Sequence, residues 1–284
     1  MKVIRIPAKI TKLLASARHK GKRIGFVPTM GALHQGHLSL ITRARQENDL
    51  VAVSIFVNPA QFGPREDLNK YPRPLKNDLL LCRKHKVDLV FLPDNKSMYP
   101  ASFSTFVNVE KLSDLLCGLA RPGHFRGVAT VVAKLLNIIR PDALYLGQKD
   151  AQQAVIIKKM VCDLNFPVKV KVSPIVRQED GLALSSRNAY LNAAEKDAAL
   201  VLFKALSLAK SLIGHGQRDA ARIISKMKEL IGRKKQAHID YAAIVDLESL
   251  QGMKKINRDC LICLAVKIGK TRLIDNLVVK YGEK

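Results

Sequence analysis

Apolar runs and amphipathic segments alternate along the first part of this chain. Residues 24–27 form a short apolar run, residues 38–46 carry Leu38, Ile41 and Ala44 three positions apart, and residues 50–57 form a second apolar run rich in β-branched side chains. A spacing of three to four residues is typical of one buried helix face, and short apolar runs are typical of buried strands. The pattern therefore predicts a strand–helix–strand unit over residues 24–57.

The same alternation continues to about residue 177. The pattern predicts helices at 75–86, 127–140 and 150–165, and strands at 87–93, 105–109, 142–147 and 168–177. Strands that alternate with helices are typical of an α/β fold with a parallel sheet. We expect a Rossmann-like, doubly wound sheet, in which ligands bind at the carboxyl ends of the strands where the winding reverses.

The last third of the chain has a different pattern. A polar connector at 178–192 ends in Asn192, a plausible N-cap with Glu195 three residues later. Helices are predicted at 193–213 and 217–232, and strands at 239–247, 258–268 and 271–280. We therefore expect two domains, 1–178 and a smaller α+β domain at 179–284, joined by a linker at about 178–192.

The turn after the first strand of the 24–57 unit carries the strongest chemical signal. It reads Pro-Thr-Met-Gly-Ala-Leu-His-Gln-Gly-His over residues 28–37, so Gly31, Gly36, His34 and His37 occupy a strand-to-helix turn. A helix start offers free N–H groups and the positive end of its dipole, and glycine lets the backbone approach a ligand. The turn predicts a phosphate site, although a plain tight loop would also explain its glycines. A metal site is disfavoured because no Glu follows in the HExxH manner.

Two further segments could complete a nucleotide site. The segment 147–150 places Gly147, Lys149 and Asp150 at a second strand-to-helix turn, where lysine suits phosphate and aspartate suits ribose, although ordinary capping would look the same. Residues 185–187, Ser-Ser-Arg, also suit phosphate. Neither a GxxxxGK[ST] loop nor a GxGxxG fingerprint occurs, so the histidine turn would have to replace them.

Other polar residues suggest an acceptor substrate. The amides of Gln61 and Gln153 suit a small molecule that bears hydroxyl and carboxylate groups. Asp78 lies on the helix after a long loop and could bind magnesium, or it could simply face solvent.

Composition narrows the class of protein. Five scattered cysteines favour reduced thiols in the cytoplasm, and the pair Cys260 and Cys263 lies in a run that reads as a buried strand. No segment is apolar over enough residues for a signal peptide or a membrane span. The formal net charge is +24, which would suit nucleic acid, but the basic runs are short and separated, and aromatic residues make up only 5%. We interpret most of this charge as solvated surface.

Taken in order, the motifs resemble the pantothenate synthetase family, the pantoate–β-alanine ligases of the HIGH-type adenylyl-transferring superfamily. The matching segments are PTMGALHQGH at 28–37, VNPAQFGP at 57–64, YPR at 71–73, GHFRGVATVVAKL at 123–135, YLGQKDAQQ at 145–153 and SSRN at 185–188. The resemblance implies a Rossmann-like domain with a C-terminal lid, a homodimer, and ATP and Mg²⁺ in the reaction. Pantoate would attack the α-phosphorus of ATP to give pantoyl adenylate and pyrophosphate, and β-alanine would then displace AMP to give pantothenate.

The resemblance also implies roles for individual residues. His37, His34 and Lys149 would be catalytic, with His37 as the proton donor. The ATP-binding residues would be Met30, Gly31, Ala32, Leu33, His34, Gln35, Gly36, His37, Gly147, Gln148, Lys149, Asp150, Val176, Leu184, Ser185, Ser186 and Arg187. Gln61 and Gln153 would bind pantoate, Gln61 also β-alanine, and Asp78 would bind Mg²⁺.

Two alternatives compete with this interpretation. A nucleotidyltransferase of the same superfamily would leave the nucleotide on its product, but amides rather than basic residues at the acceptor site argue against it. A nucleic-acid-binding protein is favoured only by the charge. We expect small-molecule substrates, with no specific nucleic acid and no membrane as partners.

Overall fold

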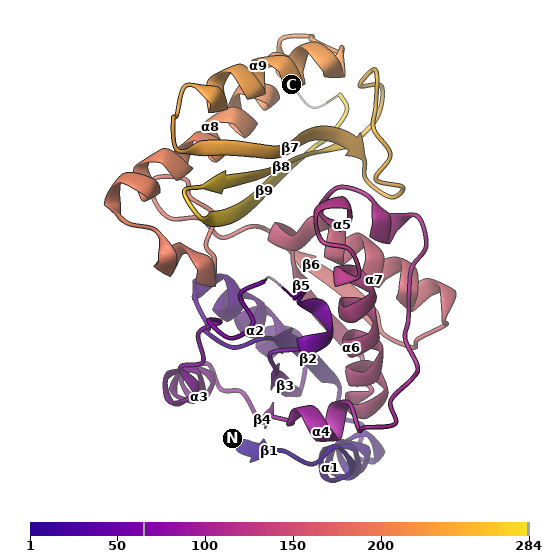
Figure 1. The fold of residues 1–284 in the computed structure, drawn as a ribbon. Coiled ribbons are helices and arrows are strands. Elements are labelled where there is room, and N and C mark those ends of the chain that lie inside the picture. The colour runs from indigo at the N-terminus through magenta and orange to yellow at the C-terminus, as the bar shows by residue number, and fades with distance from the viewer. Residues whose placement is uncertain (65, 283–284) are drawn as a thin grey trace.

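The computed structural model describes residues 1–64 and 66–282 of the chain. A six-stranded sheet forms the larger part, and every pair of neighbouring strands in it is parallel. Its strands, in spatial order, are β1 (Lys2–Ile4), β4 (Leu89–Phe91), β3 (Leu50–Ile55), β2 (Ile24–Thr29), β5 (Ala143–Gly147) and β6 (Lys169–Ser173). Helices lie on both faces (Figure 1). This is the predicted doubly wound α/β architecture.

The winding of the sheet reverses between β2 and β5. From β2 the chain passes to β3 and β4 on one side, and then crosses to β5 and β6 on the other. The connections that follow β2 and β5 therefore run in opposite directions. Because of this, the carboxyl ends of these two neighbouring strands leave a crevice between them. The turns that follow Thr29 and Gly147 both open at this crevice.

The helices cover the sheet with apolar faces. The longer ones are α1 (Pro7–His19), α2 (Gln35–Glu47), α3 (Leu75–Lys84), α6 (His124–Ile139) and α7 (Ala151–Asp163). One-turn helices α4 (Asn95–Met98) and α5 (Cys117–Ala120) and four 3₁₀ turns, at Pro59–Gln61, Leu112–Asp114, Gln148–Asp150 and Ser186–Tyr190, complete the connections. Helix α6 is buried along most of its length, because it packs between the sheet and the segments that cross it.

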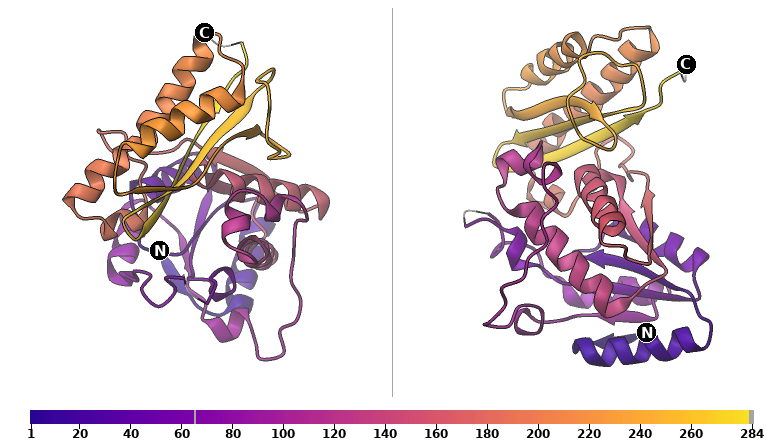
Figure 2. Two further views of the ribbon diagram at one scale, coloured as in Figure 1. Left: turned by 45° about the horizontal axis from the view of Figure 1, so that its top comes forward. Right: turned by 90° about the vertical axis from the view of Figure 1, so that its right-hand side faces the viewer.

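The C-terminal part is an α+β unit. Helices α8 (Ala193–Gly214) and α9 (Ala220–Gly232) precede an antiparallel sheet of β7 (Ala237–Asp246), β8 (Cys260–Ile268) and β9 (Thr271–Val279). Asn192 caps α8 in a reciprocal capping box with Glu195, as its sequence predicts. Figure 2 shows that the three-stranded sheet lies with one face toward α5 and α7 and the other toward α8 and α9.

Some sequence-based predictions of local structure were wrong. Residues 105–109 form no strand, because the Val107 N–H donates to the Thr130 hydroxyl of α6 at 2.9 Å instead of to a neighbouring strand. The predicted strand at 168–177 ends at Ser173, just before Pro174. Strand β1 and helix α1 were not predicted at all.

Two simpler expectations can be compared directly with the structure. All five cysteines are unpaired, and Cys260 and Cys263 are buried in β8. Within residues 1–64 and 66–282, no helix combines the length and the apolar character that a membrane span requires.

Candidate active site

A cleft of about 230 Å³ opens at the carboxyl ends of β2 and β5, beneath the segment that leads into the C-terminal sheet. Its lining contains many of the residues that the sequence singles out: Met30, His34, Gly36, His37, Gln61, Gly147, Lys149, Asp150, Gln153, Val176, Leu184, Ser185, Ser186 and Arg187. Residues far apart in the sequence thus share one cavity, at the position where a doubly wound sheet binds its ligands.

The histidine turn is built as a helix cap. His34 is the N-cap of α2, and its Nδ1 accepts the Gly36 N–H at 3.1 Å, while Nδ1 of His37 accepts the His34 N–H at 3.4 Å. A neutral imidazole has one acceptor and one donor nitrogen, so Nε2 of each ring carries the proton. The two rings lie 4.2 Å apart between centroids.

Both imidazoles are held neutral. Burial and the nearby Lys149 charge lower the pKa of His34 to about 4. Burial, His34 and Lys149 lower the pKa of His37 to about 3, although Asp150 opposes the shift at both rings. At neutral pH the pair therefore supplies two N–H donors at a helix N-terminus, an arrangement that suits phosphate oxygens.

The second turn is held from the C-terminal sheet. Asn276 of β9 donates from Nδ2 to the carbonyls of Gln148 and Lys149 at 2.9 and 3.0 Å, and it accepts from Gln148 Nε2 at 3.1 Å. Lys149 lies 3.5 Å from the Asp150 carboxylate. Burial would raise the pKa of Asp150, but the Lys149 charge opposes it and the pKa is lowered. The cleft thus contains a cation and a carboxylate on a backbone that β9 fixes.

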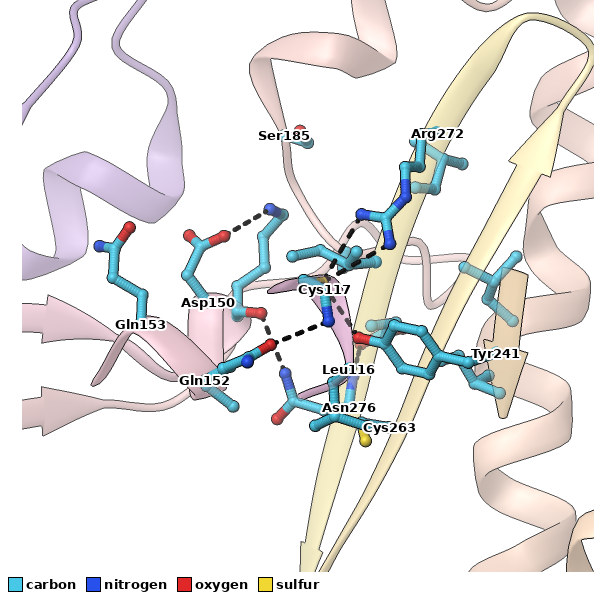
Figure 3. Close-up of a pocket in the computed structure, with 18 of the residues that line it drawn as sticks. Leu116, Cys117, Asp150, Gln152, Gln153, Ser185, Tyr241, Cys263, Arg272 and Asn276 are labelled. Carbon is cyan, nitrogen blue, oxygen red and sulfur yellow. Dashed lines mark hydrogen bonds and ion pairs between the residues drawn. The ribbon is translucent and has the colours of Figure 1, made fainter. Parts of the chain in front are cut away.

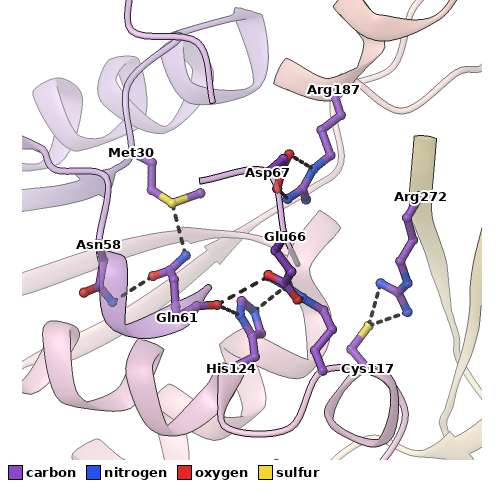
Figure 4. Close-up of polar contacts among 10 residues, drawn as sticks. Met30, Asn58, Gln61, Glu66, Asp67, Cys117, His124, Arg187 and Arg272 are labelled. Atoms are coloured by element: carbon purple, nitrogen blue, oxygen red, sulfur yellow. Dashed lines mark hydrogen bonds and ion pairs between the residues drawn. The ribbon is translucent and has the colours of Figure 1, made fainter. Parts of the chain in front are cut away.

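The mouth of the cleft is bridged by contacts from the loop after β3. Arg187 forms a bidentate pair with Asp67, with distances of 3.0 Å from the terminal nitrogen and 3.1 Å from Nε (Figure 4). The hydroxyls of Tyr71 and Ser186 lie 3.4 Å apart. These contacts join two of the predicted phosphate-binding residues to the opposite wall.

The amide of Gln61 has a fixed orientation. Asn58 Nδ2 donates to Gln61 Oε1 at 3.0 Å, and the Tyr99 hydroxyl donates to Asn58 Oδ1 at 2.7 Å. Gln61 Nε2 is left directed toward Met30 Sδ at 3.1 Å (Figure 4). Since sulfur is a weak acceptor, this N–H₂ group remains available to a better one, such as a carboxylate.

Below Gln61 lies a charged network that sequence reasoning missed. Glu66 accepts two hydrogen bonds from Arg121, whose other terminal nitrogen lies 2.9 Å from His124 Nε2. Nδ1 of His124 donates to the Gln61 carbonyl at 2.8 Å. Burial and the Arg121 charge lower the pKa of His124 to about 4, so this ring is also neutral.

The lining residues that were not predicted as site residues include four polar side chains at the Gln61 end of the cleft: Asn58, Tyr71, Arg121 and His124. Three of them lie in the segments 57–64, 71–73 and 123–135. These segments were among the family motifs found in the sequence. Their polar residues could therefore have been proposed as neighbours of Gln61.

The predicted magnesium ligand does not fit that role. Asp78 is only 1% exposed, and its two carboxylate oxygens accept the backbone N–H groups of Ala32 and Leu33 at 3.0 and 2.8 Å. A Cβ on Gly31, whose φ is +82°, would lie 2.9 Å from this carboxylate. Asp78 therefore holds the histidine turn in shape and does not line the cleft.

The remaining predicted ATP residues lie in the turns without lining the cleft. Gly31, Ala32 and Leu33 form the Asp78-bound backbone, Gln35 is exposed at the first turn of α2, and Gln148 is paired with Asn276. The Leu33 side chain is buried in the apolar core that α2 forms against β2 and β3.

A smaller cavity of about 90 Å³ adjoins the cleft, between α5 and the C-terminal sheet. Cys117 Sγ lies 3.1 Å from the Tyr241 hydroxyl and 3.6 Å from both terminal nitrogens of Arg272 (Figure 3). Asp150 and Gln153 line both spaces. The cavity is thus part of the junction between the two sheets.

Fold and site together define a nucleotide-binding α/β enzyme in which neutral imidazoles, a lysine and an arginine face a phosphate-sized space. A family model described as "Pantoate-beta-alanine ligase" matches residues 2–278. The chain belongs to the pantoate-beta-alanine ligase family, and it is accordingly a ligase that joins pantoate to β-alanine.

Individual relatives agree with this assignment. The chain is 51% identical to a pantothenate synthetase of Moorella thermoacetica over 283 residues, with 100% of both chains covered. It is 52% identical to that of Caldicellulosiruptor saccharolyticus, over 94% of this chain and 95% of the relative. The crystal structure of pantothenate synthetase from Thermus thermophilus superposes with a TM-score of 0.93 at 44% identity, covering 98% of this chain and 99% of its own.

One solved structure carries ligands in its title. It is a pantoate-beta-alanine ligase from Francisella tularensis, complexed with beta-gamma ATP and beta-alanine. It matches with a TM-score of 0.79 at 37% identity and covers 98% of this chain and 97% of its own.

Proposed function

We propose that the cleft carries out an ATP-dependent, two-step ligation through pantoyl adenylate. The observation that carries this proposal is the convergence of two neutral Nε2–H donors, Lys149 and the free amide of Gln61 in one cavity. Such a site can hold a triphosphate and a carboxylate side by side. Holding two reactants in the geometry for attack lowers the activation free energy of their reaction substantially.

In the first step, a pantoate carboxylate oxygen attacks the α-phosphorus of ATP, and the bond from that phosphorus to pyrophosphate breaks. His34, His37 and Lys149 donate hydrogen bonds to phosphate oxygens on which charge accumulates. The donor role of His37 is that of its Nε2–H, which stays on the ring because pyrophosphate leaves as an anion. The protein supplies no covalent intermediate, so positioning and electrostatic stabilisation are its contribution.

In the second step, the amine of β-alanine attacks the adenylate carbonyl, and AMP leaves. We assign pantoate to Gln61 and Gln153, and the approach of β-alanine to Gln61. The relative complexed with beta-gamma ATP and beta-alanine supports ATP and β-alanine as substrates.

The rest of the ATP would be held by the two turns and the linker. Within Met30 to His37, the residues that line the cleft contact ATP, and within Gly147 to Asp150 they bind ribose and phosphates. Val176 contacts adenine, and Leu184 to Arg187 close over the phosphates. For Gly31, Ala32, Leu33, Gln35 and Gln148 this role is indirect, because they shape the turns.

Magnesium would enter with ATP and neutralise phosphate charge. Within the described ranges 1–64 and 66–282, no group of three or more His, Cys, Asp or Glu side chains could hold a metal ion. The residue that fits best is Asp150, a carboxylate that lines the cleft and is 49% exposed at its side chain. We therefore propose Asp150 in place of Asp78.

Three further proposals concern the whole molecule. The chain forms two domains, 1–178 and 179–284, with the linker at about 178–192. It assembles as a homodimer and acts in the cytoplasm. Light scattering of the purified protein tests the dimer, and a mass of one chain would contradict it.

Oxygen labelling tests the chemistry. With pantoate labelled with ¹⁸O in its carboxylate, ATP and β-alanine, we expect one label to appear in AMP, because that oxygen stays on the α-phosphorus when the adenylate is cleaved. Label in inorganic phosphate, together with ADP, would mean an acyl-phosphate mechanism and would reject the proposal. Release of pyrophosphate without β-alanine separates the two steps.

A further inference from the structure

The amino ends of the parallel strands, opposite the cleft, carry a groove rimmed by lysines. It lies between α1 and the starts of β1 and β3, and it is lined by Lys2, Lys9, Lys12, Leu13, Ser16, Ala17, Lys20, Lys22 and Leu50. The five lysines are all exposed, and none of them forms an ion pair with an acidic side chain of the described residues. Residues from three separate segments thus form one basic surface, the α1 groove.

Nearby acidic residues do not neutralise this groove. The first acidic residue of the chain is Glu47. Asp49 and Asp88, which precede β3 and β4 at the same edge of the sheet, are paired with Arg23 at 4.0 Å and with Arg45 at 2.6 Å. The lysines therefore present uncompensated positive charge.

The lysines follow the axis of α1. Lys9, Lys12, Ser16 and Lys20 lie three to four residues apart, on one side of the helix, and span about 16 Å at 1.5 Å per residue. Together with the neighbouring Lys2 and Lys22, this row supplies five cations, which can contact at most five phosphates of a duplex. A linear polyanion matches such a row better than a compact anion does.

We propose that the α1 groove binds the phosphodiester backbone of double-stranded nucleic acid without reading its sequence. The groove contains no aromatic side chain on which an unpaired base could stack, which favours a duplex over a single strand. Helix α1 has no exposed apolar face of the kind that lies in a membrane surface, because its Ile10 and Leu14 are fully buried in the protein core. The strands run from this groove to the cleft, so both sites can be occupied together.

Salt dependence gives a quantitative test with a fluorescent 20-base-pair DNA duplex and no ligase substrates. Five phosphate contacts predict a slope of about −4.5 in log K against log [salt], or about a 500-fold loss of affinity between 50 and 200 mM salt. The variant Lys9→Gln/Lys12→Gln/Lys20→Gln/Lys22→Gln should lower the slope to about −1. The matched control Lys204→Gln/Lys210→Gln/Lys228→Gln/Lys235→Gln removes the same charge from α8, α9 and the turn after α9, and it should keep the steep slope.

Each outcome decides the proposal. Equal weakening by both variants would mean that the charge acts diffusely, and no binding at 50 mM salt with about 100 μM protein would mean that there is no site; either result overturns it. Binding to anionic vesicles or to polyglutamate but not to the duplex also overturns it. Both variants should keep pyrophosphate-release activity within twofold and an unchanged melting temperature, which separates this test from that of the proposed function.

Discussion

Arg187 and Asp67 lie 120 positions apart in the chain and form a bidentate ion pair across the mouth of the cleft, with N···O distances of 3.0 and 3.1 Å. The pair uses Nε and one terminal nitrogen of the guanidinium. The other terminal nitrogen still has two donors for a phosphate. Asp67 therefore positions an arginine that we assign to ATP.

We expect Asp67→Asn to raise the KM for ATP several-fold and to change kcat less than twofold. The amide keeps the size of the side chain but loses the charge that orients Arg187. Steady-state kinetics of Asp67→Asn, Arg187→Ala and the double variant form a double-mutant cycle, and we expect the effects to be non-additive. A lower KM in Asp67→Asn would show that Asp67 competes with ATP for the arginine.

His37→Ala should mainly lower kcat, by about 10²- to 10³-fold, because a donor to developing phosphate charge acts in the transition state. Single-turnover formation of AMP measures this directly. His215→Ala is the control, since His215 is an exposed residue at the end of α8. Unchanged turnover in His37→Ala would exclude His37 from the chemistry.

Stability should depend on pH through the buried histidines. The pKa of His37 is lowered from 6.5 to about 3 and that of His124 to about 4, so the unfolded chain binds more protons below pH 6.5. The free energy of unfolding is then greatest above pH 6.5 and falls as the pH drops toward 4, by about 1.4 kcal/mol per pH unit for each fully shifted histidine.

Urea unfolding at pH 7, 6, 5 and 4 measures this loss. His37→Asn should give a shallower dependence, because it removes one of the titrating groups. A free energy of unfolding that stays constant over this range would contradict the buried, neutral imidazoles.

Tyr99→Phe should raise the KM for pantoate several-fold with little change in kcat or in the KM for ATP. The variant removes the O–H group that donates to Asn58 Oδ1 at 2.7 Å and leaves that oxygen only the longer bond from the Ala60 N–H at 3.3 Å, so the Asn58 amide that holds Gln61 is less firmly oriented. Tyr281→Phe serves as the control, because Tyr281 is 52% exposed near the end of the described chain. Equal losses in every kinetic parameter would point to general destabilisation instead.

Local patterns predicted most of the fold correctly. The unit at 24–57 and helices α6 and α7 carry apolar spacings that reflect their buried faces, and Asn192 with Glu195 marks the start of α8 within a few residues. Where the structure of a segment depends on a distant partner, the local pattern either yielded no prediction or yielded a wrong one. Strand β1 has three residues and exists only because β4 pairs with it, and the segment 105–109 bonds to α6.

For the site, the sequence by itself determined which chemical groups are present: the histidine turn at a helix start, the turn at 147–150 that carries Lys149, and the two glutamines. Helix caps and strand-to-helix turns are local, so neighbouring residues suffice to specify them. Only the tertiary structure decided what those groups do. Asp78 supports a turn 46 positions away instead of binding metal, and Asn276 holds the Lys149 backbone from another sheet. Such contacts depend on which elements the core brings together, and that long-range packing is absent from any short stretch of sequence.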